Sequence, residues 1–212
     1  MNNLEKMFSE SKDLGQYAKG YFEYLHNLLN KLDPGAISAF VDELEDAHKN
    51  GNTVYVIGNG GSAATASHMA NDIGVDVYKK SGIPQAFRIL ALTDNNSVMT
   101  AIANDEGYDN LFLNQLKIHY RTGDKLIAIS ASGNSLNLVK AAEWVRGKKG
   151  KVIGLLGFDG GKLKNICDIV INVETPKNEY GPVEDIHLII DHFVATWLQY
   201  KRAKQTGYEY RK

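Results

Sequence analysis

The sequence predicts an α/β protein in which helices cover both faces of a parallel sheet, behind a helical N-terminal segment. Three observations support this fold class. From residue 53 onward, short β-rich runs alternate with helical stretches, an arrangement typical of parallel sheets. Three of these runs, Thr53–Ile57, Lys125–Ile129 and Lys151–Leu156, are nearly continuous in Val, Ile and Leu, as in strands buried on both faces. In residues 4–50, apolar residues recur at three- and four-residue spacing, which indicates amphipathic helices.

The N-terminal segment, residues 1–50, is predicted to form two or three helices with a break near Asp33-Pro34-Gly35, because proline interrupts a helix. These helices leave more apolar surface than a short extension can bury on its own. Another subunit commonly covers such a surface. We therefore expect a homo-oligomer whose contacts involve this segment.

Residues 51–212 are predicted to form the α/β core. Five runs have the composition of strands: Thr53–Ile57, Ala86–Leu92, Lys125–Ile129, Lys151–Leu156 and Ile169–Val173. Helices are expected at Ala63–Ile73 and at Leu136–Val145, after the first and third runs. A long helix over Val183–Lys204 opens near Pro182, since proline is well tolerated in a first helical turn.

The composition limits the partners. With 212 residues, 43% of them hydrophobic, the chain can bury a full core, and we expect one domain spanning residues 1–212. The formal net charge of −1 gives no overall attraction to nucleic acid or to an anionic membrane, so we expect neither as a partner. Cys167 is the only cysteine, which excludes an intramolecular disulfide and a cysteine-based zinc site. The N-terminus is unlike a secretory signal, and a cytoplasmic location is expected.

Two Ser/Gly-rich loops follow predicted strands and open helices: Gly58-Asn59-Gly60-Gly61-Ser62 and Ser130-Ala131-Ser132-Gly133-Asn134-Ser135. Ligands bind at this edge of an open parallel sheet. Glycines allow close backbone approach, helix N-termini attract anions and serines add donors, so the pair predicts a phosphate site. Neither loop has the P-loop or dinucleotide pattern, which argues against ATP and NAD. A single such loop could equally be a turn that caps a helix; two of them favour a ligand.

The two loops belong to a set of five segments: Gly58–Ser62, Ala103–Gly107, Ser130–Ser135, Gly157–Lys162 and Val183–His187. In this order they resemble the sugar isomerase (SIS) domain family, and within it the phosphoheptose isomerase branch. The resemblance covers almost the whole chain. It implies a three-layer fold with a five-stranded parallel sheet, a homotetramer, and no organic cofactor. It also implies an aldose–ketose isomerase that converts sedoheptulose 7-phosphate to D-glycero-manno-heptose 7-phosphate through an enediol.

The resemblance further implies roles for individual residues. Phosphate would be bound by the backbone of the first loop and by four hydroxyls, that is, by Gly60, Gly61, Ser62, Ser130, Ser132 and Ser135. Asn59 and Asp105 would line the sugar site. The family's general base, a glutamate, falls on Asp72, and its partner acid/base falls on His192. A carboxylate and a histidine can exchange protons with a substrate near neutral pH.

A metal site is a further expectation. His68 and Asp72 lie four residues apart and so share a helix face. If Glu184 also turns inward, these two residues, Glu184 and His192 form a nitrogen and oxygen ligand set suited to zinc or another divalent cation. The resemblance supports such a site, because some members of the family hold a metal at these positions.

An alternative from a different functional class stays open. The chain departs from the branch at Asp72, which replaces the glutamate, and at Ala131, which replaces a threonine. Near the last helix, Gly181 and Glu184 replace an aspartate and a glutamine. Such changes are also compatible with a non-catalytic phosphosugar-binding SIS protein that acts through protein contacts, like relatives that associate with the bacterial replication initiator. Outside the site, His187 and Asp191 are expected to form a pair at the helix surface or at a subunit contact.

Overall fold

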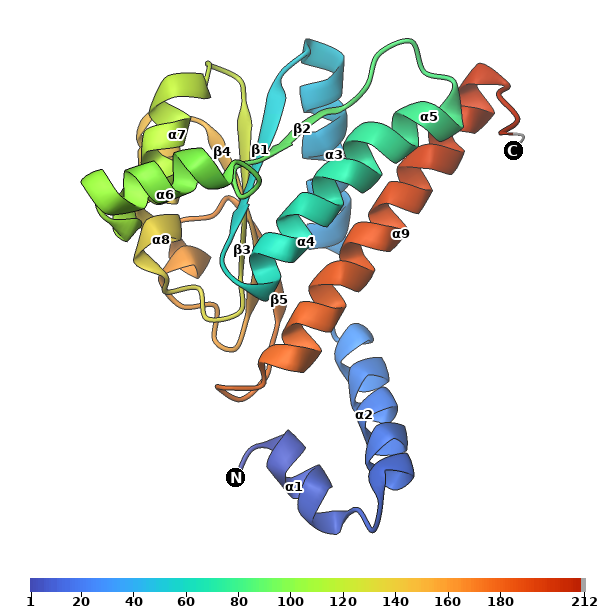
Figure 1. The fold of residues 1–212 in the computed structure, drawn as a ribbon. Helices are drawn as coiled ribbons and strands as arrows, with labels where there is room; N and C mark the ends of the chain where they lie inside the picture. The colour runs from blue at the N-terminus through green and yellow to red at the C-terminus, as the bar shows by residue number, and fades with distance from the viewer. Residues whose placement is uncertain (211–212) are drawn as a thin grey trace.

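The computed structural model describes residues 1–210 and contains a five-stranded sheet in which all neighbouring strands are parallel (Figure 1). The strands are β1 (Thr53–Gly58), β2 (Arg88–Ala91), β3 (Lys125–Ser130), β4 (Lys151–Gly157) and β5 (Ile169–Val173). Their order across the sheet is β2-β1-β3-β4-β5, which confirms the predicted fold class. Because β1 and β3 are neighbours, the loops that follow them meet at one edge of the sheet.

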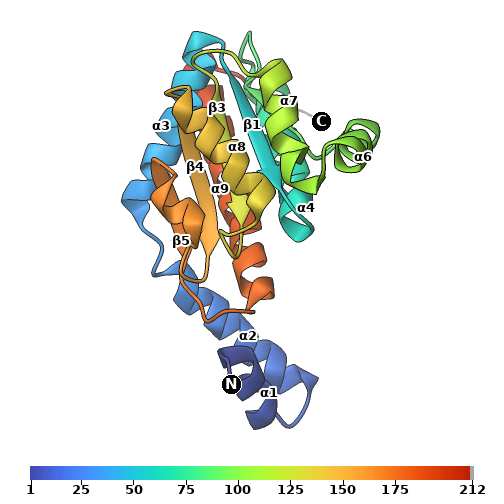
Figure 2. The same cartoon turned by 90° about the vertical axis from the view of Figure 1, so that its left-hand side faces the viewer.

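Helices cover both faces of the sheet, which is the middle of three layers (Figures 1 and 2). One face packs against α3 (Pro34–Asn50), α4 (Gly61–Met69) and α9 (Tyr180–Thr206), and the other against α7 (Leu111–His119) and α8 (Leu136–Gly147). In β1, Val54 and Val56 join the first core, whereas Tyr55 and Ile57 join the second, because successive side chains of a strand point to opposite faces. All four are buried, which explains the nearly continuous apolar sequence.

The N-terminal segment forms three helices, α1 (Asn3–Glu10), α2 (Leu14–Leu29) and α3. The Asp33 carboxylate caps α3 by accepting from the Gly35 backbone N–H, and Pro34 occupies the first turn. The predicted break at these residues is therefore confirmed.

The first two helices extend away from the sheet (Figure 1). No residue of α1 is buried, and α2 buries only Leu28. Buried Glu179 ties them to the start of α9, because its carboxylate accepts hydrogen bonds from the Asn3 backbone N–H (2.6 Å) and the Tyr24 hydroxyl (2.5 Å). This connection places the N-terminal helices beside the beginning of α9.

The helix after β1 differs from the prediction. The sequence predicts one α-helix over Ala63–Ile73, whereas α4 ends at Met69 and is followed by a π-helical segment, η1 (Ala70–Asp76), and by α5 (Val77–Ser81). A π-helix closes its hydrogen bonds five residues apart instead of four, so each turn is wider. Such turns are frequent at functional sites, and Asp72 lies in this one.

Helix α9 has 27 residues and begins at Tyr180 rather than at the predicted Val183. It runs along α4, η1 and α5 (Figure 1). In the part of the chain that the structure describes, neither α9 nor any other helix is long and apolar enough to cross a membrane.

Candidate functional site

A cavity of about 150 Å³ lies between the two Ser/Gly-rich loops, at the carboxyl edge of the sheet. This loop cavity is lined by Asn59, Ser62, Ile129, Ser130, Ala131, Ser132, Ser135, Tyr180 and Glu184. The structure therefore brings together all four predicted serines and Asn59. None of these nine lining residues is a lysine or an arginine, so an anion here would depend on hydroxyl groups and helix N-termini.

Two glycines shape the first loop through the backbone. Gly60 has a φ of +55°, a conformation that a residue with a Cβ rarely adopts, and it directly precedes α4. The carboxylate of Glu184 packs on Gly61, where an added Cβ would lie 2.2 Å from Glu184 Oε2. Gly60 thus allows the chain to turn sharply into α4, and Gly61 allows α9 to approach α4 closely.

The second loop is held in place by Gly157–Lys162, the segment after β4. Asn134 Oδ1 accepts a hydrogen bond from the Lys162 backbone N–H (3.1 Å). A Cβ added to Gly133 would lie 1.9 Å from the Gly160 carbonyl oxygen, so only glycine permits this contact between the two backbones. The packing fixes the serines that line the cavity.

The two loop regions are joined by a reciprocal amide pair that sequence reasoning missed. Asn59 Nδ2 donates to Asn137 Oδ1 (3.0 Å), and Asn137 Nδ2 donates to Asn59 Oδ1 (2.9 Å). The Tyr108 hydroxyl donates to Asn59 Oδ1 as well (2.9 Å). The one signal for Asn137 was its place in the first turn after the second loop.

Asp105, which was predicted to line the sugar site with Asn59, is the last residue of α6 (Asn96–Asp105). It is exposed, does not line the loop cavity, and its carboxylate accepts a hydrogen bond from Asn104 Nδ2 (2.7 Å). The contact to Asn59 comes instead from Tyr108, three residues further along, in the short 3-10 helix η2 (Tyr108–Asn110).

A second group of predicted residues gathers where α4 and η1 face α9. His68, Asp72 and His192 each offer a ligand atom, and these atoms lie within 4.8 Å of one another. His68 Nε2 is 3.4 Å from Asp72 Oδ2 and 3.1 Å from His192 Nε2. Two imidazoles and one carboxylate are the protein ligands of many catalytic zinc sites, which keep a fourth position open. This His/Asp cluster therefore fits zinc or a similar cation.

Glu184, the fourth residue predicted for the metal ligand set, lies apart from the His/Asp cluster. Eight residues separate it from His192, or about 12 Å along a helix axis. Its carboxylate lies against Gly61 and lines the loop cavity. Among residues 1–210, the structure thus groups only His68, Asp72 and His192 of the four residues predicted for the metal. Burial and the neighbouring charge of Asp185 raise the pKa of Glu184.

His187 and Asp191 are both completely buried, so the prediction that they pair at a surface or a subunit contact is wrong. His187 Nε2 pairs with the Leu156 carbonyl (3.0 Å), and burial lowers the pKa of this histidine to about 4. Burial raises the pKa of Asp191 to about 8, with a further contribution from the charge of Asp72. Both side chains are therefore mainly uncharged at neutral pH, which avoids the cost of burying unpaired charges.

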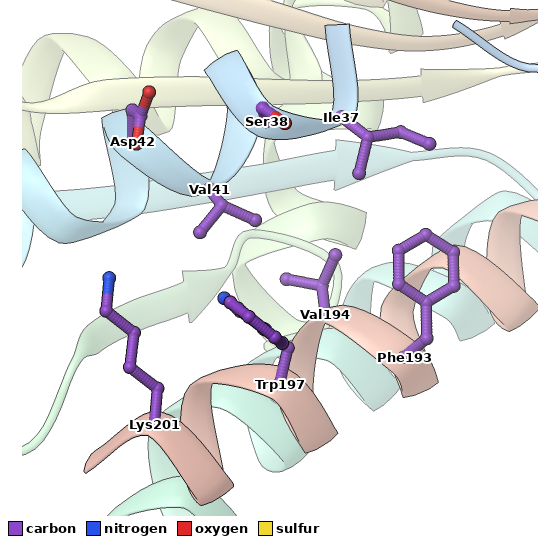
Figure 3. Close-up of a pocket in the computed structure, with 8 residues that line it drawn as sticks. All are labelled: Ile37, Ser38, Val41, Asp42, Phe193, Val194, Trp197 and Lys201. Carbon is purple, nitrogen blue, oxygen red and sulfur yellow. The ribbon is translucent and has the colours of Figure 1, made fainter. Parts of the chain in front are cut away.

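A larger cavity, of about 510 Å³, lies between α3 and α9 (Figure 3). Its lining consists of Ile37, Ser38, Val41, Asp42, Phe193, Val194, Trp197 and Lys201. Apolar side chains of the two helices face each other there, and Trp197 is 60% exposed. It shares no residue with the loop cavity or with the His/Asp cluster, so we do not assign the chemistry to it.

The SIS domain family model matches residues 16–157, more than half of the chain. A phosphoheptose isomerase of Aneurinibacillus thermoaerophilus is 39% identical over 155 residues, which cover 73% of this chain and 75% of that protein. A phosphoheptose isomerase of Citrifermentans bemidjiense is 38% identical over 177 residues, which cover 82% and 90%.

A solved structure gives the same result. The phosphoheptose isomerase of Neisseria gonorrhoeae superposes with a TM-score of 0.77 at 27% sequence identity, and the match covers 89% of this chain and 100% of that one. Both loops fall inside the matched family segment, and the sheet has the fold of these relatives. The chain therefore belongs to the SIS domain family and, within it, to the phosphoheptose isomerases.

Proposed function

We propose that this protein is an aldose–ketose isomerase that converts sedoheptulose 7-phosphate to D-glycero-manno-heptose 7-phosphate. One observation carries the proposal: the same two helices, α4 and α9, contribute both to the loop cavity and to the His/Asp cluster. Ser62 lies on α4, and Asp72 lies on η1, which continues α4. Glu184 and His192 both lie on α9. Glu184 and His192 are about 12 Å apart along the axis of α9. This separation suits a sugar whose phosphate and carbonyl ends are several carbons apart.

In this proposal the loop cavity holds the phosphate. The hydroxyls of Ser62, Ser130, Ser132 and Ser135 and the N-termini of α4 and α8 supply the donors. Phosphate binding then positions the other end of the sugar for reaction, which converts remote binding energy into correct orientation.

The His/Asp cluster carries out the proton transfer. Asp72 takes the proton from one of the carbons C1 and C2 and returns it to the other, through an enediol. His192 exchanges protons with the two oxygens. Acid and base groups placed in this way contribute about 100- to 10,000-fold to the rate. No organic cofactor is required, because the oxidation of one carbon balances the reduction of its neighbour.

We further propose that His68, Asp72 and His192 bind zinc or another divalent cation. The ligand chemistry supports this, since the set combines two imidazoles with one carboxylate. A bound cation would polarise the substrate oxygens at the carbonyl end. Each of the three would give one atom to the cation, which leaves Asp72 a second carboxylate oxygen and His192 a second ring nitrogen for proton exchange with the substrate.

The surface supports assembly into a homo-oligomer, which we propose to be a tetramer of single-domain chains. Of the residues of α1 and α2, only Leu28 is fully buried within the chain. These helices and α9 each expose large apolar side chains: Phe8, Leu14, Phe22, Phe193, Trp197 and Tyr200. A single free cysteine, Cys167, is compatible with a reducing compartment, and we propose a cytoplasmic location.

The decisive experiment is to incubate the pure protein with sedoheptulose 7-phosphate, with and without added zinc, and to measure the aldose product. Turnover in either condition supports the enzyme. Binding of the sugar phosphate without turnover in both conditions would overturn the proposal in favour of a non-catalytic binding protein.

A further inference from the structure

We propose that Asn137 is a positioning residue for ligand binding, which fixes the side-chain amide of Asn59 so that one Nδ2–H is presented to an oxygen of the phosphosugar. The proposal rests on the proposed function for the class of ligand. It concerns a side chain of α8 that does not itself line the loop cavity.

The orientation of the two amides follows from a third group. A reciprocal pair of asparagines is equally satisfied when both amides are turned over, because oxygen and nitrogen simply exchange roles. The Leu138 backbone N–H breaks this symmetry, because it is shared between the Ser135 carbonyl (3.1 Å) and Asn137 Oδ1 (3.1 Å). A backbone N–H can only donate, so the Asn137 atom beside it must be oxygen. The nitrogen of Asn137 then points at Asn59, and the Asn59 atom that receives it must be oxygen.

The hydrogen bonds of Asn59 can then be counted. Its Oδ1 accepts from Asn137 Nδ2 and from the Tyr108 hydroxyl, so both lone pairs are used. Its Nδ2 has two N–H groups, and one of them donates to Asn137 Oδ1. The other N–H has no acceptor among residues 1–210, although Asn59 lines the loop cavity. Asn59 therefore presents a hydrogen-bond donor, and not an acceptor, to the loop cavity.

Burial makes this arrangement stiff. Asn137 is only 2% exposed, so its amide cannot exchange its protein partners for water. Turning it over would place the Asn137 NH2 group against the Leu138 N–H, and such a contact between two donors in a buried place is costly. A donor held in one orientation favours ligand oxygens that accept hydrogen bonds, which are abundant on a phosphate or a sugar. We therefore expect Asn137 to contribute to affinity entirely through Asn59.

A double-mutant cycle tests this dependence. The dissociation constant for sedoheptulose 7-phosphate is measured by calorimetry for the wild type, Asn59→Ala, Asn137→Ala and the double variant. Each single variant should bind roughly tenfold more weakly, the usual effect of losing a hydrogen bond to a charged or polar ligand. The double variant should bind within about twofold of Asn59→Ala. Independent effects that multiply, or wild-type affinity in Asn137→Ala, would overturn the inference.

A matched control comes from Asn110, another asparagine of the same region. Its amide donates to the Glu106 carbonyl and accepts from Lys140 Nζ, with no contact to Asn59. Asn110→Ala should bind like the wild type. A loss equal to that of Asn137→Ala would show that any nearby amide has this effect.

A second measurement covers the case in which Asn137→Ala does not fold. In wild-type protein labelled with 15N at asparagine, adding sedoheptulose 7-phosphate should shift one side-chain proton of Asn59 and leave its partner nearly unchanged. Equal shifts of both protons, or of neither, would contradict the inference. These outcomes are independent of turnover. If the double variant binds like Asn59→Ala but the wild type forms no aldose, only the proposed function is overturned. If the enzyme is active but the effects of the two substitutions multiply, only this inference is overturned.

Discussion

His68 Nε2 and His192 Nε2 lie 3.1 Å apart, although 124 positions separate these residues in the chain. The contact joins the end of α4 to the middle of α9, and Asp72 completes the group from the π-helical segment. Each partner alone is an ordinary polar residue on a helix. Their meeting point brings two imidazoles and one carboxylate within 4.8 Å of one another, which is the basis of the acid–base and metal-binding roles proposed above.

This contact predicts how metal binding responds to substitution. Chelator-treated wild-type protein should take up one zinc ion per chain, and His68→Ala or His192→Ala should weaken that binding by more than about tenfold, because each removes a ligand. Zinc titration followed by calorimetry measures the change. His26→Ala is the matched control, since the His26 ring pairs with the Asn30 amide at the end of α2; equal weakening there would remove the His/Asp cluster as the site.

Asp72→Asn tests the proposed base. The amide keeps the shape of the side chain but cannot take up a proton, so turnover should fall by about 100-fold or more, while the affinity for inorganic phosphate stays within about twofold. Asp76→Asn, in the same π-helical segment, removes only an ion pair with Lys80 and should retain activity. Wild-type turnover in Asp72→Asn would exclude Asp72 as the base.

Gly61→Ala tests the close approach of Glu184. The added Cβ would meet the Glu184 carboxylate, so we expect a loss of about 1 kcal/mol in the free energy of unfolding. In a Glu184→Ala background, Gly61→Ala should lower the free energy of unfolding by less, because the carboxylate that the new Cβ would meet is absent. Gly147→Ala is the control: no atom lies within 4 Å of its added Cβ, and it should stabilise α8 by about 0.5 kcal/mol. Urea unfolding measures all four variants, and an equal cost of Gly61→Ala in both backgrounds would contradict the contact.

Asp191 predicts a specific pH dependence of stability. Its pKa is about 8 in the folded protein against an ordinary value near 3.8, so between these values the folded state holds a proton that the unfolded state has lost. The free energy of unfolding therefore falls as pH rises through this interval. The effect of His187 has the opposite sign and lies between its pKa of about 4 and its ordinary 6.5.

Above pH 6.5 only Asp191 of this pair changes the stability. Relative to Asp191→Asn, wild-type protein should lose about 1.6 kcal/mol between pH 6.5 and 8, because the slope of 1.36 kcal/mol per pH unit falls to half at the pKa of about 8. Denaturant unfolding in the presence of a chelator measures the difference. Exposed Asp42 gives a control, since Asp42→Asn should run parallel to the wild type. A pH-independent difference between wild type and Asp191→Asn would disprove the raised pKa.

The layered fold was predictable because its signal is local. Each strand is a short aliphatic run between helices, and the predicted run Ile169–Val173 coincides with β5. The loops were predictable for the same reason, since glycine and serine are required by the backbone turn itself. The π-helix at Ala70–Asp76 was not, because a hydrogen bond to the fifth rather than the fourth residue leaves almost no trace in apolar spacing.

The orientation of side chains along α9 was also beyond the sequence. His187 and Asp191 have the spacing of a surface pair, and burying two such groups is unusual; the protein does so by keeping both mainly uncharged. Glu184 shares its helix with His192, but the direction of its carboxylate depends on the missing Cβ of Gly61 in a distant segment. Contacts of this kind are set by tertiary packing and not by residue type.

The presence of Glu184 in the loop cavity makes the site sensitive to the acidity of the solution in a way that serines alone would not. Its pKa is already raised by burial, and a phosphate arriving beside it adds negative charge that favours the protonated acid still more. If the loop cavity binds the phosphate as proposed, binding of the ligand and uptake of a proton by Glu184 would therefore be linked. A glutamine at the same position would bind phosphate without exchanging a proton with the solvent.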